Sequence, residues 1–303
     1  MKRNILPIMW KAGIALVFAV ALAAATPRTI EIISPDNTAK RSGNLQYGPW
    51  VYEATKVGSL VGKVKDLEIV SLKATLEAPQ GKTIQESEGD RTATFTNEIT
   101  VKRGRMTSKG SKLTYKENNG LGTLDGPATM HQDPKEKGDD PVDLTGSRMT
   151  FNVDNNVSTS EGNVVLKSGK QEGRSSKVYY EEDSTLAIFN DDKQVDLLRK
   201  RDDGDLVIKA KEVRSLTDDK RLIAAGNVTL VDGDLTTSGT ELYYDDNSGI
   251  AIVIGNPAKS ENVKEGFKLT GEKIIRHDVK KHLATRGPTG YKLPVKEFEK
   301  SVK

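Results

Sequence analysis

The chain has 303 residues, of which 35% are hydrophobic, so it is polar for a protein that folds around one thick core. It contains no cysteine, which excludes a disulfide framework, thiolate metal sites and a cysteine nucleophile. Without Lys2, Arg3 and Lys11, which carry the net charge of +3, the basic residues equal the 43 acidic ones. This balance argues against a nucleic-acid partner, which needs a basic face.

Residues 1–25 are predicted to be a signal peptide that directs export and is then cleaved. The three basic residues flank or precede an apolar run over residues 12–25, which ends in the small side chains that a signal peptidase accepts. The run is shorter than the ~20 residues that a membrane-spanning helix needs. An uncleaved membrane anchor is the alternative interpretation.

Residues 26–60 are predicted to form an N-terminal edge strand followed by an irregular loop. The β-branched run at residues 29–33 indicates a short strand, and the stretch over residues 40–48 is rich in Gly and polar side chains. A second strand is expected at residues 50–52, and a longer β-prone run covers residues 67–76.

From about residue 92 to residue 290 the sequence repeats. Tyr115, Tyr180 and Tyr244 recur at spacings of 65 and 64 residues, and each lies 18 positions after the first residue of an opening motif. This motif begins with Gly-Asn in the second and third copies and with Asn97-Glu98 in the first. A fixed internal period is typical of stacked repeats, so we expect one continuous architecture of similar units.

Polar clusters rich in Asn, Asp and Gly divide the repeats, and such residues favour the tight turns of hairpins. These clusters lie at residues 117–120, 154–156, 182–184, 218–220 and 245–248. Helical periodicity is not sustained anywhere over a comparable length. The sequence therefore predicts an all-β fold of consecutive hairpins over residues 61–290. The charged turn at residues 199–204 is a candidate boundary between two sections, although the phase of the repeat continues across it.

Alternation along the predicted strands places one set of large side chains on a common apolar face, because successive side chains point to opposite sides of a sheet. This set contains Val164, Leu166, Val178, Tyr180, Leu186, Ile188, Val228, Leu230, Leu242, Tyr244, Ile250 and Ile252. The face can be an ordinary sandwich core. It can also be a groove for lipid, if the two layers are splayed along one side.

No motif for catalysis, metal or cofactor stands out. His131, His277 and His282 lack the spacing of a metal site, and no Ser/His/Asp pattern or nucleophile elbow occurs. Residues 58–63 match a phosphate-binding loop only in part, because the glycines are too close and no Ser or Thr follows Lys63. We therefore expect a protein that is not an enzyme and that uses no metal or cofactor.

The residues Ala224, Gly226-Asn227-Val228, Tyr244-Asp245 and Gly255-Asn256-Pro257 resemble the OstA-like repeats of the periplasmic lipopolysaccharide transport family, LptA with the related domains of LptC and LptD. The resemblance covers about residues 60–290. It implies an elongated β-jellyroll, an open two-sheet slab, in a periplasmic protein whose interior holds the acyl chains of lipopolysaccharide or a similar lipid. It also implies end-to-end pairing into a bridge between the inner and outer membranes. The chain departs from the family in its length and in Asn97-Glu98.

A slab of hairpins leaves unpaired backbone groups on its first and last strands. Ile30 and Ile32 on the first strand, and Ile274 on the last, are the candidate edge-pairing residues. Head-to-tail contact with another copy, or with a related domain of a membrane partner, is the expected consequence. The alternative function is that of a structural envelope or surface β-solenoid without lipid cargo. Residues 291–303 are predicted to be a flexible tail.

Overall fold

The structure, a computed structural model, describes residues 28–301, so the predicted signal peptide lies outside the described residues. The chain forms β1 (Glu31–Ile33), β2 (Lys40–Ser42), β3 (Trp50–Glu53), β4 (Leu60–Val64), β5 (Leu67–Ser71), β6 (Lys73–Glu77), β7 (Thr92–Arg103), β8 (Met106–Lys116), β9 (Leu121–Gln132), β10 (Val142–Asn152), β11 (Val157–Ser168), β12 (Gln171–Glu181), β13 (Leu186–Arg199), β14 (Leu206–Leu216), β15 (Arg221–Asp232), β16 (Leu235–Asp245), β17 (Ile250–Asn262), β18 (Phe267–Asp278), η1 (Val279–Lys281), β19 (Leu283–Arg286) and η2 (Val295–Phe298).

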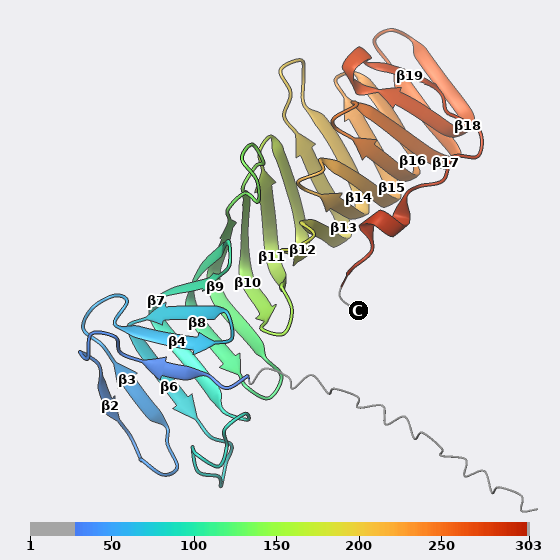
Figure 1. Cartoon of the computed structure of the whole chain (residues 1–303). Helices are drawn as coiled ribbons and strands as arrows, with labels where there is room; N and C mark the ends of the chain where they lie inside the picture. Colours follow the sequence, from blue (N-terminus) through green and yellow to red (C-terminus); the bar gives the residue numbers. More distant parts are fainter. Residues whose placement is uncertain (1–27, 302–303) are drawn as a thin grey trace, which may run out of the picture.

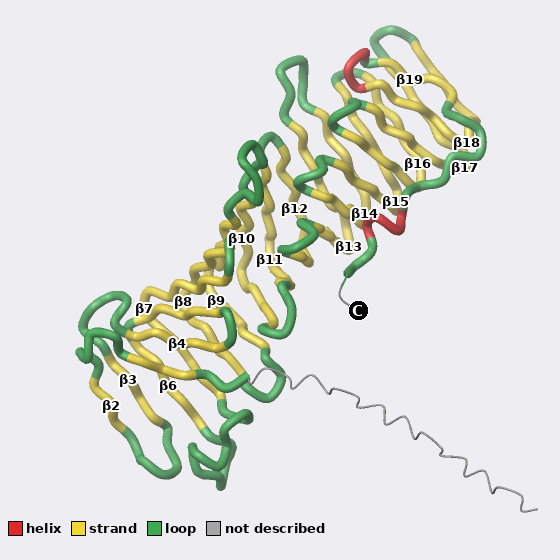
Figure 2. Tube along the Cα trace, viewed as in Figure 1, coloured by secondary structure: helices red, strands yellow, loops and turns green. Residues whose placement is uncertain are grey.

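All nineteen strands belong to one antiparallel sheet, which is long and open. Figure 1 shows β2 and β3 at one end of the molecule and β18 and β19 at the other. Figure 2 shows loops at both ends of the long strands. The prediction of an all-β fold of consecutive hairpins is confirmed. Neither of the two helices in the described range is long and apolar enough to cross a membrane.

The Gly-Asn pairs of the repeat form corners in the long strands. Every pairing among β7–β18 carries a register shift near the middle of the strands, for example between Glu161 and Val164 on β11. The two residues between them, Gly162 and Asn163, have φ angles of 79° and 50°. Glycine and asparagine adopt this left-handed conformation more easily than other residues, so the pair marks the point at which a strand bends.

The corners fold the sheet lengthwise into two layers. Layer A contains the half-strands next to the turns at residues 104–105, 133–141, 169–170, 200–205, 233–234 and 263–266, and layer B those next to the turns at 117–120, 153–156, 182–185, 217–220, 246–249 and 279–282. Beyond β7 each layer continues through its own short strands: β5, β4 and β1 extend layer A, while β6, β3 and β2 extend layer B. The five polar clusters predicted as turns are all turns of layer B.

Between the layers lies one continuous core of apolar side chains, which runs from Ile30 to Val279. Side chains from both halves of each bent strand contribute to it, since the alternation resumes inward after the corner. The loop at residues 200–205 joins β13 to β14, which pair with each other along both layers. The sheet is therefore continuous across the residues considered as a boundary.

The N-terminal edge candidates lie in different environments. Ile32 pairs with Gly62 of β4 and is half-buried, and β4 is the only strand that pairs with β1 among the described residues. Ile30 precedes β1 and is 3% exposed in the core. Its amide already donates a hydrogen bond to the Glu117 carboxylate at 2.8 Å, which leaves Ile32 and not Ile30 on an open backbone edge.

At the other end, β19 follows β18, which the sequence analysis takes as the last edge. It pairs with residues 275–278 of β18, and the carbonyl of Ile274 accepts a hydrogen bond from the amide of Gly287 at 2.8 Å. Ile274 is thus already engaged. Residues 267–273 of β18 pair only with β17 in the described structure and form the open part of this edge. Pairing between molecules stays a prediction.

The C-terminal segment packs on the outer face of layer B, where the sequence analysis expects a flexible tail. Phe298 of η2 is completely buried, and its carbonyl accepts a hydrogen bond from Arg214 at 3.2 Å. Glu297 forms an ion pair with Arg221 at 2.5 Å, and Ser301 hydrogen-bonds to the Glu181 carboxylate. The C-terminal segment is held in place because it covers apolar side chains on the outer face of layer B.

Candidate functional site

Eight of the twelve residues predicted to share an apolar face lie together in the core between the layers. They are Val164, Leu166, Val178, Tyr180, Val228, Leu230, Leu242 and Tyr244, and each is at most 3% exposed. They come from β11, β12, β15 and β16, on both sides of the corners. The structure therefore brings this set together, while its role in lining a lipid path stays a prediction.

The other four residues lie outside this core. Leu186 and Ile188 belong to a separate cluster on the outer face with Leu216, Ile223 and Phe298. Ile250 is half-buried and Ile252 is 6% exposed, and neither joins the core.

The expected alternation is wrong by one residue on β13 and β17. The inward side chains there are Ala187, Phe189, Ala251 and Val253. Both strands begin with runs in which every residue is apolar, so alternation alone cannot choose between the two faces. Small alanines fill part of the narrow interior, and the larger aliphatic side chains point outward.

The outer ends of layer A face those of layer B along one line, which we call the mouth. Near the middle of the molecule, Arg103 of layer A forms an ion pair with Glu182 of layer B. It also donates hydrogen bonds to the carbonyls of Asn152 and Asn155 at 2.9 and 3.1 Å. Burial raises the pKa of Glu182, and the neighbouring Arg103 opposes this shift. The pair therefore links the layers at the cost of removing a carboxylate from water.

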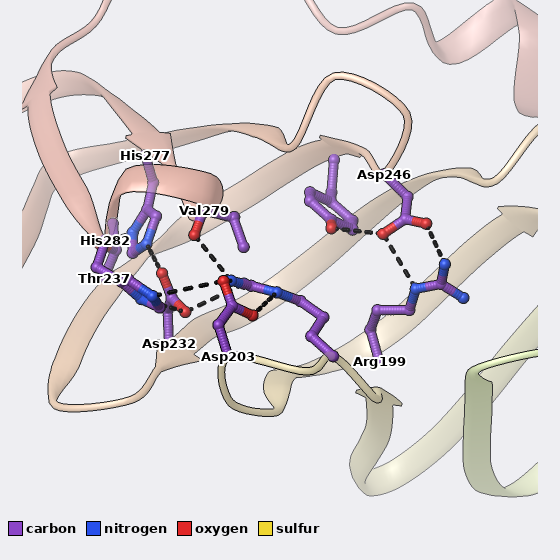
Figure 3. A network of polar contacts seen from close by, with 10 residues as sticks. Arg199, Asp203, Asp232, Thr237, Asp246, His277, Val279 and His282 are labelled. Carbon is purple, nitrogen blue, oxygen red and sulfur yellow. Dashed lines mark hydrogen bonds and ion pairs between the residues drawn. The ribbon is translucent and has the colours of Figure 1, made fainter.

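A second group of contacts crosses the mouth towards the C-terminal end. Figure 3 shows Arg199 of layer A bound through two nitrogens to the carboxylate of Asp246 in layer B, at 2.5 and 3.1 Å. Arg201 donates to the carbonyl of Val279 in layer B at 3.0 Å. It also pairs with Asp203 and Asp232 of its own layer, which hold its guanidinium in place.

Within residues 28–301, the contacts that cross the mouth all involve side chains. Backbone hydrogen bonds between neighbouring turns run along each layer instead, for example from Glu182 N to the carbonyl of Asn156 at 2.9 Å in layer B. In layer A, Lys200 N donates to the carbonyl of Lys170 at 2.8 Å. The mouth can therefore open without the loss of a backbone hydrogen bond among the described residues.

The three periodic tyrosines lie in the core with their hydroxyl groups directed to the mouth. Tyr115 donates to the carbonyl of Arg28 at 2.7 Å, and Tyr244 donates to Asp246 at 2.8 Å. The Tyr180 hydroxyl is buried without a hydrogen-bond partner among the described residues. Burial raises the pKa of all three phenols, so they stay neutral. Each ring thus joins the apolar core to the polar mouth.

A buried polar chain occupies the core near the C-terminal end. Asp232 contacts Nε2 of His277 at 3.0 Å, and Nδ1 of His277 contacts the hydroxyl of Thr237 at 2.9 Å. The order of groups matches that of a catalytic triad, but the Asp232 and His277 side chains and Thr237 are all fully buried. No substrate can reach them in this arrangement. The three side chains therefore serve to satisfy one another's hydrogen bonds inside the core. The described residues contain no group of three or more His, Cys, Asp or Glu side chains that could hold a metal ion.

Sequence reasoning misses the residues of the mouth. The run at residues 199–203 is visible as a charged turn, but nothing in the sequence shows which turn of the other layer faces it. A hollow of about 540 Å³ lies at this point of the mouth and is lined by cationic side chains on both sides. A smaller one, of about 170 Å³, lies beside Arg103 and Glu182.

Comparison with solved structures gives distant likenesses. No model of a known protein family matches the sequence, and no curated protein matches it. A solved structure that is similar is LptH from Pseudomonas aeruginosa, described as the LptA-homologous periplasmic component of the conserved lipopolysaccharide transport device. The sequence identity is 15% and the TM-score is 0.35, and the match covers 42% of this chain and 95% of LptH.

Proposed function

We propose that the chain is a periplasmic lipid-transport protein that shields acyl chains between its two layers. The observation that carries this proposal is the combination of a continuous apolar core with a mouth that only side chains close. A lipid that enters between the layers keeps its acyl chains in the core and its head group in water. No backbone bond of the sheet has to break for this entry. The OstA-like sequence motifs favour a lipopolysaccharide-type cargo.

The free energy gained by burying acyl chains is large enough to offset the contacts that are lost when the mouth opens. Each methylene removed from water contributes about 0.8 kcal/mol, so ten methylenes contribute about 8 kcal/mol. A hydrogen bond to a charged group contributes about 1.5–3 kcal/mol net. The mouth contacts of Arg199 and Arg201 are few, and inserted acyl chains can offset their loss. Contact with apolar side chains is non-directional, so a bound chain can slide along the core.

The ends of the sheet extend this proposal to an assembly. Strand β1 and residues 267–273 of β18 present open edges at the two ends of the sheet. Pairing of one end with the opposite end of another copy, or with a related sheet in a membrane protein, continues the core from one molecule to the next. We propose this end-to-end contact as the route that bridges the inner and outer membranes.

A structural envelope protein is the second candidate, and the dense packing of the core favours it. The eight predicted residues that lie in the core are at most 3% exposed, as in an ordinary protein interior. Such a protein would stack its repeats and bind nothing between the layers.

Photo-crosslinking in the native host separates the two candidates. A diazirine analogue of leucine at Leu230 or Val253, which point into the core, is expected to form adducts with lipid. The matched controls are the neighbours Thr229 and Ile252, which point away from the core and should form few adducts. Mass spectrometry of the purified protein identifies the lipid.

Equal labelling at both members of each pair would show that lipid contacts the molecule without entering between the layers. Absence of lipid adducts at Leu230 and Val253, in protein that folds normally, would favour the structural candidate.

A further inference from the structure

We propose that the larger hollow at the mouth is an anion site that binds the phosphate group of an acyl lipid. This inference rests on the proposed function, because it assigns the head-group end of the same cargo. The hollow has a volume of about 540 Å³. Its lining residues are Lys170, Arg199, Lys200, Arg201, Asp202, Asp203, Tyr244, Asp246, Gly249, Val279 and Lys280.

Positive charge predominates in this lining and comes from both layers. Five cationic side chains face three carboxylates, and Lys280 of layer B lies across the mouth from the other four cations. A concave surface of this kind concentrates the field of its charges and attracts anions. A phosphate placed here would contact both layers at once.

Three of the cations hold no strong carboxylate partner. Lys280 donates to the carbonyl of Asn247 at 2.9 Å, and Lys200 has no carboxylate within 4.0 Å among the described residues. Lys170 pairs with Asp202 at 3.2 Å, but that carboxylate is 98% exposed, and so exposed a pair contributes little. These three ammonium groups are therefore available to a ligand.

The two arginines are fixed in position instead. Asp246 holds Arg199, as Figure 3 shows. Asp203 and Asp232 hold Arg201. A planar guanidinium can present two parallel N–H groups to phosphate as well as to carboxylate. Phosphate can thus replace Asp246 on Arg199, and this exchange would loosen one contact that closes the mouth.

The hollow also lies where a head group must lie if acyl chains enter the core. Val279 and Tyr244 belong to its lining, and both side chains are also part of the apolar core. The Tyr244 hydroxyl donates to Asp246 at the rim. A phosphorylated lipid can place its phosphate at the cations and its hydrocarbon beside Tyr244, so it fits both the cationic and the apolar part of the hollow. Free phosphate fits only the cationic part.

Isothermal titration calorimetry of the full chain tests the site with three probes. These are dioctanoyl phosphatidic acid below its micelle concentration, dioctanoylglycerol with the same chains and no phosphate, and inorganic phosphate. We expect phosphatidic acid to bind about tenfold more tightly than dioctanoylglycerol. The double variant K200A/K280A should weaken phosphatidic acid about tenfold, or about 1.4 kcal/mol, and leave dioctanoylglycerol unchanged. The control K167A/K177A removes two lysines that do not line the hollow and should change neither value.

The outcomes separate the site from the proposed function. If both lipids bind equally, or if K200A/K280A binds phosphatidic acid like the unmodified chain, the anion site is wrong while lipid binding stands. If neither lipid binds, the proposed function fails. Inorganic phosphate then decides the site: binding that K200A/K280A abolishes supports an anion site for free phosphate, and binding that is absent or unchanged in the variant overturns it. Thermal melting followed by circular dichroism verifies that each variant is folded.

Discussion

The first corner of the repeat contains a residue that the fold does not favour, so a single substitution there should stabilise the protein. Asn97 and Glu98 have φ angles of 67° and 56° and occupy the positions of Gly162-Asn163 and Gly226-Asn227 in the later copies. A left-handed conformation costs most residues about 1–2 kcal/mol. The cost is smaller for asparagine, because its side chain forms hydrogen bonds with the nearby backbone. Glu98 is exposed and forms no ion pair or side-chain hydrogen bond within the described residues that the change would remove.

We therefore expect Glu98→Asn to raise the free energy of unfolding by about 0.5–1 kcal/mol, roughly half of the left-handed cost. The reverse change, Asn163→Glu, should lower it by a similar amount. Urea unfolding followed by the fluorescence of Trp50, which lies in β3, measures the effect. Glu88→Asn, another exposed position with an ordinary φ, is the control and should change little. The argument would be refuted if Asn163→Glu lowered the free energy of unfolding while Glu98→Asn left it unchanged or lowered it as well.

Three further predictions follow from the core, the mouth and the tail. Val253→Asp should prevent folding, because it buries an unpaired carboxylate, while Thr229→Asp, at a half-buried position on the other face, should leave soluble protein; expression and thermal melting compare them. Arg103→Met should cost about 3 kcal/mol by leaving Glu182 buried and unpaired. Since burial raises the pKa of Glu182, this loss should shrink as the pH falls towards 4.5 and the carboxyl group gains a proton, and unfolding curves at several pH values would show it. Phe298→Ala should release the C-terminal segment and make it the first site of limited proteolysis, whereas unchanged resistance would show that the ion pairs alone hold it.

The repeat and its turns could be predicted because each depends on local chemistry. Asn, Asp and Gly define the turns of layer B, and the Gly-Asn pairs are visible as a period although their role as corners is not. The faces of β13 and β17 could not be assigned, because their first residues are apolar on both sides, and the C-terminal segment that covers Leu186 lies more than a hundred residues away. The mouth contacts depend on how the two layers face each other, which no alternation pattern encodes. Arg199 and Asp246 are 47 positions apart.

Because the corners recur at a constant spacing, the length of the molecule depends on its number of repeats. Tyr180 on β12 and Tyr244 on β16 lie four strands apart, as do Tyr115 on β8 and Tyr180. Neighbouring strands are about 4.8 Å apart, so one repeat corresponds to about 19 Å along the sheet. Each strand contacts mainly the strands beside it, so a whole repeat can be added or removed without altering either end. Duplication of a single segment would therefore lengthen the molecule by a fixed step.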